Sequence, residues 1–325
     1  MISIVVPIFN EEEIVELFHE ALTDSMKEEA WEVVYVNDGS RDSSLRLLTE
    51  LQAKDAHVVV VDLSRNWGHM GAISAGLQTA IGDAVVLMDG DFQDPPEVVP
   101  ELVAAWRNGA QVVTAVRRSR KEKRKVLAKL FPLFYRLLGA LSDFPIPLNA
   151  GIFGLLDRQA VDSINSLREG SRYLPGLRAW VGYKTGVVLY DRQDRAGGEG
   201  KLTFLSRIKY AMDAITSFSY KPLRLSFGLA GFAISLAVIL AICTVFSKSA
   251  VNLLGYGVAA AVFLMGGFLL LSVGVLGEYL GRVYDEVRSR PLSIINKVYD
   301  TSRENTGQVD LSRRLSYRKK PFRVA

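Results

Sequence analysis

The sequence contains very little cysteine: Cys243 is the single one among 325 residues. One thiol excludes an intramolecular disulfide framework and a zinc site built from cysteines. Histidine is scarce as well, with three residues, and the chain has neither an HExxH zinc motif nor a GxxxxGKS/T phosphate loop. The first residues pass directly into an apolar stretch with no basic segment before it, so we expect no signal peptide.

Charge is nearly balanced, with a formal net charge of +4, but the basic residues are clustered. One cluster covers 117–125 and a second lies in the tail at 282–325. Such clusters suit nucleic acid, anionic lipid or a phosphorylated substrate. The tail cluster follows the long apolar run 250–277, which favours a lipid surface or a phosphorylated substrate and predicts no nucleic-acid partner.

Two uncharged apolar runs, 225–246 and 250–277, contain 22 and 28 residues. About 20 helical residues cross the hydrocarbon core of a bilayer, so we expect two membrane spans. The short connection 247–249 makes them antiparallel, and the basic residues at their other ends place both chain termini on the cytoplasmic side. A mixed apolar and charged stretch before them predicts an interfacial amphipathic helix. The expected domains are therefore a cytoplasmic domain at 1–203, the interfacial helix at 204–222, two spans at 223–281 and a basic cytoplasmic tail at 282–325.

The first 115 residues alternate between short β-branched runs and amphipathic stretches. This order predicts an α/β fold with an open, mostly parallel sheet and helices on both faces. Ligands of such sheets bind beyond the carboxyl ends of the strands. Four polar segments follow the predicted strands and are expected to meet at that edge: 9–11, 38–40, 65–68 and 89–91.

The strongest local signal is the acidic segment that follows the fourth predicted strand. Asp89 and Asp91 are spaced i, i+2, which in an extended chain places both carboxylates on one side. Two neighbouring carboxylates repel unless a cation lies between them, and Mg²⁺ is commonly held by one or two carboxylates together with substrate phosphates. Gln93 adds a neutral oxygen at the next position on that side. The alternative is an acidic turn closed by the prolines at 95–96.

Two further segments carry weaker signals. Asp38 ends a predicted strand and could accept hydrogen bonds from a base or a ribose, although Asp-Gly is also ordinary turn chemistry. Arg117, Arg118 and Arg120 follow the fifth strand and could neutralise a diphosphate or a lipid phosphate. The alternative for these arginines is an exposed charged linker.

Taken together, these segments resemble one family. In order they are Val-Val-Pro-Ile-Phe-Asn-Glu at 5–11, Asn-Asp-Gly-Ser-Arg-Asp at 37–42, Asn-Trp-Gly at 66–68, Met-Asp-Gly-Asp-Phe-Gln-Asp-Pro-Pro-Glu at 88–97 and Val-Arg-Arg-Ser-Arg at 116–120. The set resembles a glycosyltransferase of family 2 with a GT-A (Rossmann-like) fold. Two apolar runs and a basic tail narrow the resemblance to polyprenyl-phosphate glycosyltransferases, similar to bactoprenol glucosyltransferases and dolichol-phosphate mannose synthases.

The resemblance implies a role for each matching residue. It places Pro7, Glu11, Asp38 and Asp89 at the nucleotide sugar, and it assigns Asp89, Asp91 and Gln93 to a Mg²⁺ or Mn²⁺ ion. Asp91 and Asp157 are the implied catalytic acids, with Asp157 on the acceptor side. The implied contacts to the acceptor phosphate are Arg117, Arg120, Arg195 and Lys201.

One departure from the family pattern concerns the general base. Many relatives have Gly-Asp-Phe where this chain has Gly151, Ile152 and Phe153. The substitution removes one acid from the expected site, and it leaves open which residue, if any, acts as a base and which sugar is used.

The implied reaction is an inverting, metal-dependent transfer of a hexose to undecaprenyl or another polyprenyl phosphate at the cytoplasmic membrane face. Glucose from UDP-glucose is the first expectation, and mannose or an aminoarabinose derivative are alternatives. A processive polysaccharide synthase is disfavoured because no Gln-x-x-Arg-Trp segment is present. A non-catalytic membrane scaffold is disfavoured because the acid pair is intact. The glycines at 277 and 281 are compatible with a homo-oligomer.

Overall fold

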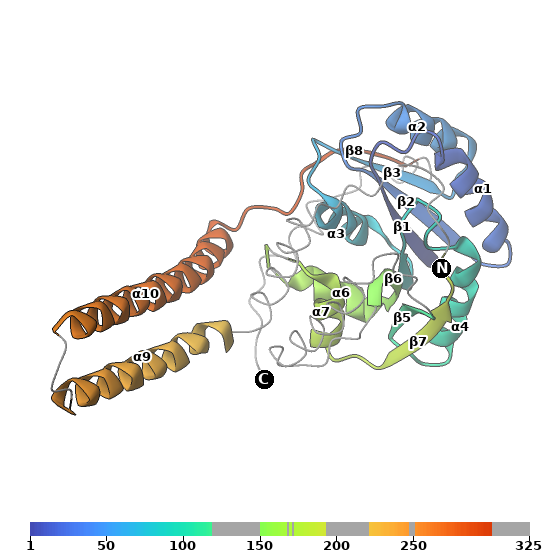
Figure 1. The fold of residues 1–325 in the computed structure, drawn as a ribbon. Helices are drawn as coiled ribbons and strands as arrows, with labels where there is room; N and C mark the ends of the chain where they lie inside the picture. The colour runs from blue at the N-terminus through green and yellow to red at the C-terminus, as the bar shows by residue number, and fades with distance from the viewer. Residues whose placement is uncertain (119–149, 168, 171, 193–220, 247–250, 301–325) are drawn as a thin grey trace. The chain divides into compact units, whose positions relative to one another are not determined.

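A computed structural model describes residues 1–118, 150–167, 169–170, 172–192, 221–246 and 251–300. Its centre is a sheet of eight strands in the order β7-β5-β6-β4-β1-β2-β3-β8 (Figure 1). The strands are β1 (Ile2–Ile8), β2 (Trp31–Asn37), β3 (Val58–Leu63), β4 (Ala84–Leu87), β5 (Val112–Arg117), β6 (Ala150–Asp157), β7 (Thr185–Tyr190) and β8 (Ile295–Tyr299).

The sheet is mixed, with a parallel centre. β1 pairs in parallel with β2 and β4, β2 with β3, and β5 with β7. β6 is antiparallel to both β4 and β5, and β8 is antiparallel to β3. The predicted α/β sheet is therefore confirmed, and the two antiparallel strands come from parts of the chain in which sequence reasoning placed none.

Helices cover both faces of this sheet. α1, α2 and α4 lie on one face, and α3, α6 and α7 lie on the other (Figure 1). The bounds are α1 (Val15–Ser25), α2 (Ser44–Lys54), α3 (His69–Thr79), α4 (Val99–Arg107), α6 (Arg158–Ser166) and α7 (Leu174–Trp180), with a 3₁₀ turn η1 at Pro96–Val98.

Burial on both faces explains why the central strands are apolar throughout. Successive side chains of a strand point to opposite faces. On β1, Ile4 and Val6 join a core cluster with Phe18 of α1. Val5 points the other way, toward α3, where a Cβ added at Gly76 would lie 2.2 Å from a Val5 methyl. Glycine at this position allows the helix to approach the sheet closely enough to close the second layer.

Two long helices, α9 (Lys221–Phe246) and α10 (Val251–Arg288), form a separate unit and pack on each other. Within the described residues, one segment is long and apolar enough to cross a membrane, Leu264–Arg288. The apolar segment Ser226–Leu236 of α9 is shorter. Of the two expected spans, the described residues thus provide one candidate. The predicted interfacial helix at 204–222 lies outside the described residues, apart from its last two, which belong to α9.

The expected basic tail is wrong in its first part. α10 continues to Arg288, and the described residues from Pro291 belong to the same unit as the sheet, where 295–299 forms edge strand β8. The amide of Ser64, just after β3, donates to the carbonyl of Ile294 at 2.9 Å. Sequence reasoning missed this strand because a basic, polar segment after an apolar run has the composition of a solvated tail.

Candidate active site

A pocket of about 230 Å³ lies at the carboxyl edge of strands β1 to β4. The four polar segments predicted to converge do meet here. The lining residues are Pro7, Ile8, Phe9, Glu11, Asp38, Asn66, Gly68, His69, Asp89, Gly90 and Asp91. All four residues predicted to contact the nucleotide sugar line the pocket. Two of the three predicted metal ligands, Asp89 and Asp91, line it as well.

Two of the loops are interlocked through Gly39. This residue has φ +67°, a left-handed conformation that suits glycine, and a Cβ there would lie 2.5 Å from the backbone carbon of Arg65. The loop after β2 therefore lies directly against the loop after β3. The Asp-Gly pair read as turn chemistry is a turn, and it also shapes one wall of the pocket.

Asp38 connects the same two loops. Its side chain is buried, and one carboxylate oxygen accepts a hydrogen bond from the amide of Trp67 at 2.7 Å. Burial raises the pKa of Asp38, and the amides of Trp67 and Gly68 oppose that shift. The carboxylate thus fixes one wall of the pocket while still lining it.

The acid pair stands on a bent loop rather than on an extended segment. Phe92 adopts φ +60°, and Asp91 accepts a hydrogen bond from the amide of Gln93 at 3.1 Å. Asp91 is buried, and Oδ1 of Asp89 lies 3.3 Å from Nε2 of His69, without hydrogen-bond geometry between them. The i, i+2 argument assumed an extended chain, whereas the two carboxylates reach the same pocket from a bent backbone.

These donors fit a hard divalent cation. Oδ1 of Asp89 is buried and makes no hydrogen bond, and the Asp91 carboxylate lines the same pocket. Within the described residues, no group of three or more histidine, cysteine or acidic side chains could enclose a metal. Two carboxylates with an incomplete protein shell match a Mg²⁺ or Mn²⁺ ion that takes its other ligands from water and substrate phosphates.

Comparison with known proteins identifies the family. The model of glycosyl transferase family 2 matches residues 3–164. A glycosyltransferase of Bacillus subtilis, YkcC, is 40% identical over 91% of this chain and 94% of its own length. The chain is a member of glycosyl transferase family 2. Among other relatives, the bactoprenol glucosyl transferase of Shigella phage SfII is 37% identical over 91% of this chain and 97% of its own, and an Escherichia coli prophage homologue is 36% identical over 91% and 99%.

Solved structures with a similar chain trace include glucosyl-3-phosphoglycerate synthase of Mycobacterium tuberculosis in complex with phosphoglyceric acid. That chain is 20% identical, with a TM-score of 0.42 over 67% of this chain and 79% of the other. The same synthase in complex with Mn²⁺, UDP-glucose and phosphoglyceric acid gives a TM-score of 0.41.

In this glycosyltransferase, Gln93 does not lie where a metal ligand was expected. Its side-chain oxygen accepts a hydrogen bond from the guanidinium of Arg192, and Gln93 does not line the pocket. The bend at Phe92 turns the Gln93 side chain out of the register that an extended segment would give. The expected third oxygen of the metal site is therefore not brought to the pocket.

Of the four basic residues predicted to contact the acceptor phosphate, the structure describes only Arg117. Arg117 ends β5, is half-buried, and donates from Nε to the hydroxyl of Tyr190 at 3.2 Å. Arg120, Arg195 and Lys201 lie outside the described residues.

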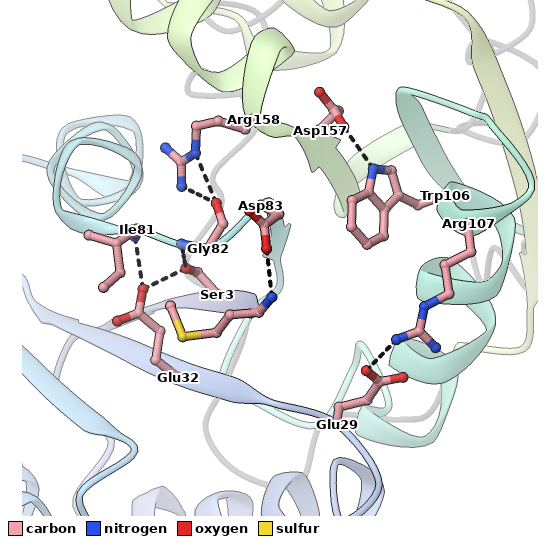
Figure 2. Close-up of polar contacts among 11 residues, drawn as sticks. Ser3, Glu29, Glu32, Ile81, Gly82, Asp83, Trp106, Arg107, Asp157 and Arg158 are labelled. Atoms are coloured by element: carbon pink, nitrogen blue, oxygen red, sulfur yellow. Dashed lines mark hydrogen bonds and ion pairs between the residues drawn. The ribbon is translucent and has the colours of Figure 1, made fainter.

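The acceptor-side role predicted for Asp157 is wrong, because the residue lies at the opposite edge of the sheet. It pairs with Ala84 at the start of β4, whereas Asp89 and Asp91 follow the end of that strand. One carboxylate oxygen caps α6 through the amide of Gln159 at 2.9 Å. The other accepts from the indole of Trp106 at 2.8 Å, as Figure 2 shows. A Leu-Leu-Asp-Arg segment carries no signal of strand direction, so the antiparallel course of β6 was not foreseen.

Sequence reasoning also missed a buried polar cluster beside the acid pair. Asp94 and Tyr190 are each 3% exposed and share a hydrogen bond of 2.9 Å, and the half-buried Arg117 donates to the Tyr190 hydroxyl. Asp94 was hidden in the acidic motif, where Pro95 and Pro96 gave it the appearance of a turn residue. Nothing in the local sequence marks Tyr190, because only the parallel pairing of β5 and β7 brings it to Asp94.

Proposed function

We propose that this enzyme transfers a hexose, glucose from UDP-glucose in the first instance, to a polyprenyl phosphate such as undecaprenyl phosphate. The observation that carries the proposal is the pocket lined by Asp38, Asp89 and Asp91 at the carboxyl edge of the sheet. Its setting supports the same conclusion, since relatives matching over 91% of the chain are named bactoprenol glucosyl transferases.

The donor would bind across the strand ends. Pro7, Glu11 and Asp38 form the part of the pocket suited to a nucleoside, and Asp89 with Asp91 forms the part suited to a diphosphate and its cation. Asp38 is held by the Trp67 amide, so this wall is already formed before a ligand arrives. Preorganised polar groups cost little reorganisation when charge develops in the reaction.

The reaction requires a leaving group that can accept negative charge and a nucleophile that is already negatively charged. A divalent cation held by Asp89 and Asp91 would supply neutralisation of the diphosphate as the glycosidic bond breaks. A phosphate monoester is anionic near neutral pH, so its oxygen attacks the anomeric carbon without a strong general base. Direct attack inverts that carbon. The family acid replaced here by Ile152 and the distant position of Asp157 both agree with a mechanism that lacks a protein base.

Anchoring at the bilayer would bring the site to its insoluble acceptor. Leu264–Arg288 supplies one candidate span, and we propose that the apolar segment 225–246 supplies a second. Basic residues at the outer ends of these helices favour termini on the cytoplasmic side. Holding the active site at the membrane surface raises the local concentration of the lipid acceptor around it.

The test is a donor panel with the purified full-length enzyme. UDP-glucose, GDP-mannose and a UDP-aminoarabinose derivative, each radiolabelled in the sugar, would be offered with undecaprenyl phosphate and Mg²⁺ or Mn²⁺. We expect label from UDP-glucose in the organic phase as one sugar per lipid. Label from another donor would change the sugar, a polymer would indicate a processive synthase, and no lipid-linked label from any donor would contradict the proposal.

A further inference from the structure

A buried polar cluster lies beside the acid pair and has no part in the donor pocket. Its members come from three separate places: Asp94 from the loop after β4, Tyr190 from the end of β7, and Arg117 from the end of β5. Asp94 and Tyr190 are each 3% exposed, so neither can be satisfied by bulk water. Buried polar groups need hydrogen-bond partners, and each hydrogen bond in this cluster has a defined donor and acceptor.

The hydrogen bonds form one connected path. The amide of Asp89 donates to Oδ2 of Asp94 across 3.4 Å, a long contact. The hydroxyl of Tyr190 donates to Oδ1 of Asp94 at 2.9 Å. The Tyr190 oxygen in turn accepts from Nε of Arg117 at 3.2 Å. The path therefore runs from the backbone of the acid pair to a cation at the end of β5.

The protonation of Tyr190 fixes the direction of these bonds. Burial, and next the charge of Asp94, raise the pKa of Tyr190 to about 12, so its hydroxyl keeps its proton at physiological pH. Its proton goes to Asp94, and a lone pair is then left for Arg117.

Register and packing hold the hydroxyl in place. Arg117 and Tyr190 are partners in the parallel pairing of β5 and β7. The Tyr190 ring packs edge-to-face on Phe153 with centroids 5.2 Å apart. Using Nε for Tyr190 leaves the two terminal nitrogens of Arg117 for other partners, and within the described residues neither makes a hydrogen bond. A free arginine side chain loses rotamer entropy when a ligand orders it, and prior anchoring at Tyr190 reduces that cost.

We infer that Tyr190 is a positioning residue: anchored by Asp94, its hydroxyl orients Arg117 toward the phosphate of the lipid acceptor and couples that cation to the loop of the acid pair. The inference rests on the proposed function, since it takes the anion at Arg117 to be the acceptor phosphate. It assigns Tyr190 and Asp94 to the acceptor side of the site and leaves the nucleotide wall at Asp38 independent of them.

The decisive variant is Tyr190→Phe, which keeps the ring on Phe153 and removes only the hydroxyl. Tyr183→Phe is the matched control, because Tyr183 precedes the same strand and its hydroxyl bonds to Ser163 at 2.8 Å, on an element outside the cluster. Full-length enzyme in detergent would be assayed for kcat, for the KM of each substrate and for melting temperature. We expect Tyr190→Phe to raise the KM for undecaprenyl phosphate about tenfold, or to lower kcat by that factor, with the KM for UDP-glucose within twofold of wild type.

A double-mutant cycle separates positioning from a general structural role. In an Arg117→Lys background, which removes the Nε donor, Tyr190→Phe is expected to have no further effect on the acceptor KM. Additive effects, or a loss of melting temperature with unchanged kinetics, would overturn the inference. So would an increase confined to the KM for UDP-glucose.

Lipid binding measured without turnover distinguishes failure of the Tyr190 inference from failure of the proposed function. Native mass spectrometry would compare retention of undecaprenyl phosphate by wild type, Tyr190→Phe and Tyr183→Phe. If wild type and the control retain the lipid and Tyr190→Phe retains less, the inference holds. Equal lipid retention by all three proteins, together with equal kinetics, would refute the positioning role of Tyr190 and leave the proposed function intact. If wild type neither binds nor glycosylates the lipid, the proposed function fails and the inference fails with it.

Discussion

The side-chain amide of Asn296 donates to Oδ2 of Asp62 at 2.8 Å, while Asn37 donates to the other oxygen of the same carboxylate at 2.8 Å. Asp62 is thereby shared between β8, which follows the long helix α10, and β2, whose exit loop carries Asp38. A segment that reads as a tail is thus hydrogen-bonded into the sheet directly beside the donor pocket.

We expect Asn296→Ala to loosen this edge of the sheet. The variant removes one hydrogen bond to a buried carboxylate, which costs on the order of 1–3 kcal/mol. Hydrogen exchange should show faster exchange at the amide of Ser64, which bonds to Ile294, with no change at the amides of β1 in the sheet centre. Asn165→Ala, which removes an amide contact to α3, is the control. Unchanged protection at Ser64 would mean that β8 is held without Asn296.

Asp91→Asn should abolish transfer while the protein stays folded. The substitution preserves size and removes the charge that a divalent cation needs, so kcat should fall by about 100-fold or more. Label reaching the lipid phase is the measurement, with melting temperature as the folding check. Asp24→Asn, at an exposed ion pair on α1, is the matched control. Near-normal turnover by Asp91→Asn would refute the metal assignment.

Gly39→Ala is expected to damage the donor pocket. The new Cβ would have both an unfavourable φ and a contact of 2.5 Å with the backbone of Arg65, so the two loops must separate. Gly182→Ala has a similar φ of +70° but meets its nearest atom at 4.0 Å, and it therefore reports strain alone. Calorimetric UDP titration should show weaker binding for Gly39→Ala than for Gly182→Ala. Equal affinities would show that the loop contact does not shape the site.

Asp157→Ala should lower stability and spare catalysis. It removes the cap of α6 and the acceptor of the Trp106 indole, a loss of about 1–2 kcal/mol. The melting temperature should decrease, and kcat at a temperature well below the transition should remain within about twofold of wild type. An inactive variant with an unchanged melting temperature would restore a catalytic role to Asp157.

Mild acid should destabilise the sheet through His19. Burial lowers the pKa of this histidine in spite of the Asp55 carboxylate 3.3 Å away, with Tyr35, His57 and Glu20 also nearby. The folded state therefore binds a proton less readily than the unfolded state. The stability it contributes is present above the unfolded value of about 6.5 and is lost as pH falls toward the lowered one. Melting temperature should decrease less between pH 7.5 and 5 in His19→Gln than in wild type, and parallel curves would contradict this.

Much of the donor side could be predicted because its signals are local. The apolar strand β1 and the polar exit at Glu11, or β4 with Asp89, are each read from a few adjacent residues, and parallel strands necessarily bring such exits together. Gln93 failed for the opposite reason. Its place depended on one backbone angle at Phe92, which residue identity does not fix.

The sequence by itself determined the alternation of strands and helices in the first 115 residues, the family motifs and the polar residues that line the pocket, since these follow from hydrophobic period and turn chemistry within short segments. Only the tertiary structure decided the direction of β6, which carries Asp157 away from the site, and the return of β8 to the sheet. It alone also brought Tyr190 to Asp94 across 96 positions of chain. Such contacts depend on which strands become neighbours, and that choice is made by packing of the whole sheet rather than by any local pattern.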